Sequence, residues 1–157
     1  MATVTTKGLR NSQFSYPAGN KSVIRGNFTT SAAGVAANSD LATAVQVNDV
    51  VRIAVLPAGV ELHDALVIVS DAFAASTTAD IGFLYADGVD VAAAPQDAAY
   101  FFAALATSST GRTRATVAKA PVRLPKDAFL VLTRKGAADS ALGIVDVLVD
   151  CVLQGPN

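Results

Sequence analysis

The sequence predicts an all-β protein, an antiparallel β-sandwich or jelly roll with one short helical insertion and an extended N-terminal arm. Short β-type runs recur along the chain, turn-forming Pro, Gly, Asn and Asp separate them, and only one segment has helical character. A βαβ arrangement would need repeated helices, which the sequence lacks. We therefore expect an extended arm at residues 1–20 and a single sandwich domain at residues 21–157.

The strands are predicted from alternation and from the turns that bound them. Residues 79–85 alternate apolar and polar side chains, the period of a half-exposed strand, whereas residues 66–69 are apolar on both faces and predict burial between two layers. Asn48-Asp49 and Pro57-Ala58-Gly59 bound another run. The expected strands are Val23 to Thr30, Val50 to Leu56, Leu62 to Val69, Thr78 to Tyr85, Ala115 to Leu124, Phe129 to Thr133 and Val145 to Leu153.

Three segments depart from this rhythm. Pro95-Gln96-Asp97 followed by residues 98–105 predicts a short helix, because proline and an acid suit a first helical turn. Residues 31–42 are small and weakly patterned, and we interpret them as a linker. Residues 1–20 are rich in Thr, Ser and Asn and cannot bury enough apolar surface to fold alone, so we expect them to order against a partner.

Composition limits the class of protein. The chain has 157 residues, of which 52% are hydrophobic and 16% charged, so it holds enough apolar surface for a folded core. Its single cysteine excludes an internal disulfide and a Cys-rich metal site, and Cys151 has the parity of an inert core thiol. The longest apolar run, residues 98–106, is too short to cross a bilayer, and no secretory signal is visible. We expect synthesis in a cytoplasm and no membrane partner.

The formal net charge of −1 conceals a segregated pattern. Residues 1–26 hold four bases and no acid, residues 40–97 hold nine acids and one base, and residues 112–135 hold seven bases and one acid. Either these blocks form separate basic and acidic patches or they intermix in the fold. The basic segments lack interleaved aromatic residues, so no nucleic-acid partner is expected.

Few residues suggest chemistry. Glu61, His63 and Asp64 form the cluster most worth testing for catalysis, with Glu61 and His63 expected on one strand face and Asp64 on the other. Residues 87–90 (DGVD) resemble part of a calcium loop but lack its full ligand pattern, and a turn explains them more simply. No nucleophile elbow, phosphate loop or dinucleotide fingerprint occurs. We therefore expect no catalytic residue, no cofactor and no metal.

Small, uncharged side chains suit surfaces buried between chains, because they lower the cost of desolvation. Four blocks then carry a resemblance, namely residues 48–60 (NDVVRIAVLPAGV), 66–73 (LVIVSDAF), 76–83 (STTADIGF) and 124–133 (LPKDAFLVLT). Their strands and turn placement resemble the capsid cement proteins of tailed bacteriophages, which decorate and stabilise the head and have a jelly-roll-like β-sandwich. The resemblance extends over residues 20–153.

The resemblance implies a non-enzymatic virion protein on the capsid exterior, assembled in the host cytoplasm. It implies two partners, the major capsid protein and further copies of the chain, with a homotrimer at local three-fold positions. Lys7, Arg10, Phe14 and Tyr16 are the arm residues expected to contact a partner. The alternatives are a virion carbohydrate-binding module or head-fibre base protein and, more remotely, a small hydrolase using the Glu61, His63 and Asp64 cluster.

Overall fold

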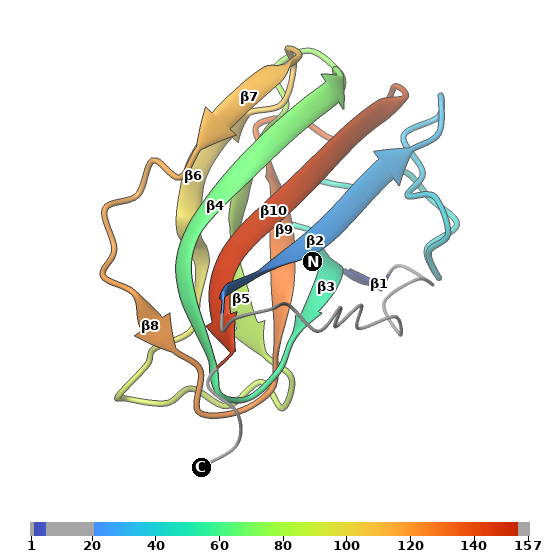
Figure 1. The fold of residues 1–157 in the computed structure, drawn as a ribbon. Helices are drawn as coiled ribbons and strands as arrows, with labels where there is room; N and C mark the ends of the chain where they lie inside the picture. The colour runs from blue at the N-terminus through green and yellow to red at the C-terminus, as the bar shows by residue number, and fades with distance from the viewer. Residues whose placement is uncertain (1, 6–20, 154–157) are drawn as a thin grey trace.

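The computed structural model describes residues 2–5 and 21–153, which form two β-sheets packed face to face (Figure 1). The first sheet has the order β1-β3-β9-β5-β6, with the bounds Thr3–Thr5, Val50–Leu56, Ala128–Lys135, Thr78–Tyr85 and Asp97–Ala106. The second has the order β2-β10-β4-β7, with the bounds Lys21–Thr30, Gly143–Leu153, Val60–Asp71 and Gly111–Arg114. The short strand β8 (Val122–Arg123) also pairs with β4. The pairings are antiparallel apart from β1 with β3, which is parallel.

The core lies between the two sheets and follows the alternation in the sequence. Along β10, Val145, Val147, Val149 and Cys151 are buried, and the residues between them face outward. Strand β9 is buried over most of its length because it lies at the centre of the first sheet. These strands confirm the β-sandwich and the buried position of Cys151, where desolvation raises the thiol pKa to about 11.

The expected short helix is wrong, because residues 97–106 form strand β6. Burial decides the conformation here: Tyr100, Phe101 and Phe102 are buried in the core, and the Tyr100 ring packs edge-on against Phe83. A half-buried pleated surface favours aromatic side chains, and this gain outweighs the helix propensity of the neighbouring alanines. In the described residues the structure contains strands, bridges, turns and bends, and no helix.

Gly82 lets β6 approach β5 closely. The pairing of these strands carries register shifts on both sides of Ile81. A Cβ atom built on Gly82 would lie 2.1 Å from the carbonyl oxygen of Asp97 and 2.5 Å from the amide nitrogen of Tyr100. A side chain at position 82 would therefore push the start of β6 away from the sheet.

Two other expectations differ in part from the structure. The strand expected over residues 115–124 is present only at Val122–Arg123, because the chain leaves the sheet between β7 and β8. Thr116 and Val117 instead donate backbone hydrogen bonds to the carbonyl oxygen of Phe101 in β6. The small-residue segment over 31–42 contains turns and isolated bridges, including one between Thr30 and Ala36.

The N-terminal strand is attached to the first sheet by backbone and side-chain contacts. Val4 is fully buried, and the amide of Ala2 donates to Oδ1 of Asp49 at 2.8 Å. The other carboxylate oxygen of Asp49 accepts from the amide of Gln46 at 2.9 Å. Asp49 thus joins β1 to the start of β3, and residues 6–20 connect β1 in one sheet to β2 in the other.

Candidate interaction surface

The outer face of the second sheet has a mixed apolar and charged character. No described segment covers this face, which is turned toward the viewer in Figure 1. Leu66 on β4 lies opposite Leu148 on β10, and Ile68 lies opposite Asp146. The half-buried aliphatic side chains of this face are Leu66, Ile68, Ile144, Leu148 and Val152. We call this surface the open face.

Ion pairs flank the aliphatic side chains of the open face. Nη2 of Arg25 on β2 lies 2.7 Å from Oδ1 of Asp146, an oxygen that also accepts from Nδ2 of Asn27 at 2.8 Å. On the opposite side of the face, Arg114 of β7 pairs with Asp64 of β4. Pairs near the surface of this kind contribute little to folding stability. An apolar centre with a charged rim has the composition of a protein interface.

The expectation for Glu61, His63 and Asp64 is half right. Nε2 of His63 lies 3.1 Å from Oε1 of Glu61, so these two side chains do share a face. Asp64 does not point to the other face, because a bulge in the β4–β10 pairing shifts the register between Asp150 and Cys151. All three side chains reach the outer side of β4, where Asp64 is held by Arg114.

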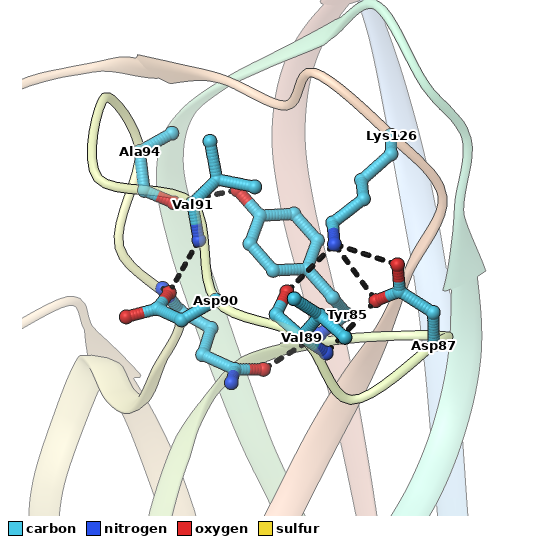
Figure 2. A network of polar contacts seen from close by, with 8 residues as sticks. Tyr85, Asp87, Val89, Asp90, Val91, Ala94 and Lys126 are labelled. Atoms are coloured by element: carbon cyan, nitrogen blue, oxygen red, sulfur yellow. Dashed lines mark hydrogen bonds and ion pairs between the residues drawn. The ribbon is translucent and has the colours of Figure 1, made fainter.

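Lys126 organises the loop that follows β5 (Figure 2). Its ammonium donates to both carboxylate oxygens of Asp87, at 2.8 and 2.7 Å, and to the carbonyl oxygen of Val89 at 2.6 Å. It also lies 4.6 Å from the centre of the Tyr85 ring. The hydrogen bond from Lys126 lowers the pKa of Asp87, with the amide of Val89 contributing next. The carboxylate of Asp87, the first acid of the DGVD segment, is thus held by a lysine ammonium.

The remainder of this loop is fixed by its own polar groups. The Tyr85 hydroxyl donates to the carbonyl oxygen of Ala94 at 2.5 Å, and its pKa is raised by burial and then by the nearby Asp90 and Asp87. Oδ1 of Asp90 accepts from the amides of Gln96 and Val91, at 2.7 and 2.9 Å. Residues 86–96 are therefore a structured turn, as the simpler interpretation of the DGVD segment proposed.

An open pocket of about 380 Å³ lies beside this loop, on the outer face of the first sheet. The guanidinium of Arg52 stacks 4.5 Å above the Phe129 ring at its wall. The other lining residues are Thr3, Val50, Leu84, Tyr85, Ala86, Asp87, Gly88 and Gln96. The lining combines the basic Arg52 and the acidic Asp87 with apolar walls.

A buried ion pair, which the sequence interpretation missed, lies between the sheets. Arg134 and Asp139 are fully buried, with Nε and Nη2 of Arg134 each 3.0 Å from Oδ2 of Asp139. Only the contact of Arg134 Nε has hydrogen-bond geometry. Two buried atoms of the pair, Nη2 of Arg134 and Oδ1 of Asp139, have no hydrogen-bond partner. Arg134 Nη1 donates to Thr107 Oγ1 at 2.8 Å, and the guanidinium lies 4.6 Å from the Phe73 ring.

Desolvation dominates the electrostatics of this pair. It raises the pKa of Asp139 from 3.8 to about 6, although the charge and hydrogen bond of Arg134 act in the opposite direction. Burial also lowers the pKa of Arg134. Arg134 continues the inward parity of Ala128, Leu130 and Leu132, and this signal in the sequence could have revealed a buried arginine.

The remaining expectations concern the arm residues, metal binding and membrane spans. Lys7, Arg10, Phe14 and Tyr16 lie outside the described residues. Within residues 2–5 and 21–153, no group of three or more His, Cys, Asp or Glu side chains is arranged to hold a metal ion. In the same part of the chain, no helix has the length and apolarity needed to span a lipid bilayer.

Comparison with solved structures identifies a shared fold. A chain in the capsid of Ralstonia phage GP4 matches with a TM-score of 0.69 and 18% identity, over 99% of this chain and 100% of that chain. A chain in the capsid asymmetric unit of cyanophage Pam1 matches with a TM-score of 0.58 and 17% identity, over 91% and 94%. No family model and no curated protein matches the sequence. The expected resemblance to phage capsid proteins is therefore confirmed at the level of the fold.

Proposed function

We propose that this chain is a non-enzymatic structural protein of a tailed-phage virion, a cement protein that binds the outside of the major capsid protein lattice. In this proposal three copies form a homotrimer at local three-fold positions, after assembly in the host cytoplasm. The observation that carries the proposal is the structural likeness to a chain from the Ralstonia phage GP4 capsid, which extends over 99% of this chain and 100% of that chain. The open face supports it, because it offers an apolar centre and a charged rim to a partner.

A cement protein stabilises the capsid because it binds only the assembled state of the shell. A protein that binds the assembled lattice, and not its separated subunits, stabilises the lattice by mass action. Three copies joined around an axis bind three capsid sites at once, so weak individual contacts gain from a high effective concentration. This mechanism needs no covalent chemistry from Glu61, His63 or Asp64.

The arm contributes contacts in the same proposal. Lys7, Arg10, Phe14 and Tyr16 belong to the segment that connects β1 to β2, and we assign them to the binding of an adjacent subunit. Deleting the arm from residue 1 would also remove Val4, which is buried in the core. Point variants are therefore the better test, because they leave β1 in place.

The experiment combines light scattering with sedimentation. The purified chain should have the mass of a trimer and should co-sediment with DNA-free heads of the phage, assembled without this chain. The variants Lys7→Glu, Arg10→Glu, Phe14→Ala and Tyr16→Ala should keep the wild-type melting temperature and reduce co-sedimentation. A folded monomer without affinity for heads would contradict the proposal. Binding to a glycan array without affinity for heads would support the carbohydrate-binding alternative.

A further inference from the structure

The two sheets end at neighbouring edges on the same side of the sandwich, and only one of these edges is covered by a further described strand. In the first sheet the edge of β3 is covered by β1, which pairs with it in parallel. In the second sheet β2 is the edge strand, and it pairs with β10 alone over residues 21–28. Its last residues are covered, since Ala37 donates to the carbonyl oxygen of Thr29. Figure 1 shows β2 as the outermost arrow on that side of the sheet.

The register identifies which backbone groups of β2 point away from β10. The carbonyl of Thr29 points away from β10, because it accepts from Ala37. In an antiparallel strand both backbone groups of one residue point to the same side, and the side alternates. The β2–β10 pairing runs without a register shift, so Val23, Arg25 and Asn27 also direct their N–H and C=O groups to the open side. No described residue pairs with these backbone groups.

We propose that the edge of β2 at residues 21–27 binds an extended strand of the shell protein by β-augmentation. This inference rests on the proposed function and names the surface that performs it. An added strand would continue the sheet and extend the open face across the joint between the two proteins. Val23 is 49% exposed, and Arg25, although paired with Asp146, has a side chain 63% exposed, so both side chains lie at the surface beside the new strand.

Charge identifies the kind of strand that fits. Lys21, Val23 and Arg25 lie in alternation on the outer side of β2, and residues 21–30 contain no acid. The complementary strand therefore carries carboxylates opposite the two bases and an aliphatic residue between them. A second copy of β2 brings bases and no acid, and residues 1–20 of a second copy likewise contain two bases and no acid. A different polypeptide is thus the better complement.

The test is a proline at position 23. Val23→Pro removes an N–H that points away from β10 and that no described residue accepts, so every β2–β10 hydrogen bond remains. We expect an unchanged melting temperature and oligomeric state, with binding to DNA-free heads weakened by about tenfold or more because a hydrogen bond is lost and the ring obstructs the incoming strand. Val23→Thr tests the side chain alone and should bind heads as the wild type does.

Ala106→Pro is the matched control on the opposite edge. Thr107 donates to Thr77 of the neighbouring chain segment, so the N–H of Ala106 points away from β5 and its loss also leaves the fold intact. This variant should bind heads normally.

Normal binding by Val23→Pro would overturn the inference while leaving the proposed function in place. A change in the oligomeric state of Val23→Pro would also overturn it, because a second copy would then occupy the edge. Failure of the wild-type chain to bind heads would contradict both.

Discussion

At the scale of single residues, the Arg134–Asp139 pair is the feature most sensitive to substitution. Both side chains are fully buried, and desolvation works against both charges. Such a pair offers little net stability relative to apolar residues, but each member depends on the other. Thr107 and the Phe73 ring complete the surroundings of the guanidinium.

Removing one member of this pair should be costly. Asp139→Ala removes the oxygen that accepts a hydrogen bond from Nε of Arg134 and leaves a buried donor unpaired, so we expect a loss of about 1–3 kcal/mol in the free energy of unfolding. The double variant Arg134→Met, Asp139→Leu removes both charges and should be more stable than Asp139→Ala. Urea denaturation measures both. A single variant as stable as the wild type would show that the carboxylate does not support the arginine.

The pair also predicts a pH dependence. The pKa of Asp139 is raised to about 6 in the folded state, against 3.8 ordinarily, so between these values the folded state binds a proton that the unfolded state does not. The contribution of Asp139 to the free energy of unfolding should therefore increase as the pH falls from about 6 to about 4. Carbon-13 NMR of the carboxyl group should give a midpoint near 6, and Asp139→Asn should remove this part of the pH dependence. A midpoint at or below 3.8 would contradict it.

The alternation of residues along a strand predicts correctly which face some side chains occupy, and fails for others. Cys151 was correctly predicted as a core thiol from the alternation of the last strand. Asp64 was placed on the wrong face, since a bulge adds one residue and reverses the parity, and no local sequence signal marks it. Arg134 has the inward parity of its strand, but its charge hides it from any interpretation based on hydrophobicity.

At the scale of elements, strands bounded by clear turns could be predicted and the rest could not. The strand Val50–Leu56 has the bounds that its flanking turns predict. Strand β6 was expected to be a helix, because the burial that favours its aromatic residues depends on β5 and β9, which lie far away in sequence. Strands β7 and β8 are too short for alternation to define.

Gly82 provides the prediction at this scale. Gly82→Ala places a Cβ against the Asp97 carbonyl oxygen, so β6 must move, and we expect a loss of about 1–3 kcal/mol. Gly111→Ala is the matched control, because a Cβ there meets nothing within 4 Å. It should leave the free energy of unfolding within about 0.5 kcal/mol of the wild type. Equal stability of the two variants in urea denaturation would contradict this account of β6.

At the scale of the whole molecule, the charge blocks of the sequence intermix. Arg114, Lys119, Lys126 and Lys135 belong to the basic block, and each lies beside an acid of the acidic block. The partners are Asp64, Asp97, Asp87 and Asp80. Of the two interpretations, mixing is therefore confirmed for these residues. Segregation in sequence did not indicate patches because antiparallel pairing brings distant blocks together.

The sandwich and its likeness to chains of phage capsids were foreseeable from turn placement and alternation. The surface proposed to bind the shell protein, the edge of β2, was not foreseeable. The place of β2 at the edge of the described sheet depends on which strands become neighbours, and neither composition nor motif determines that order. The sequence-level site residues Lys7, Arg10, Phe14 and Tyr16 remain proposals, and the edge of β2 adds a surface that can be tested in the described part of the chain.

The most direct test of a cement role is the thermal stability of phage heads with and without this chain. DNA-filled heads assembled without it should release DNA to an intercalating dye at a lower temperature than complete heads, and adding the purified wild-type chain back should restore the higher temperature. Val23→Pro should restore it less than the wild type does at the same concentration. Heads that release DNA at the same temperature with or without the chain would contradict the account.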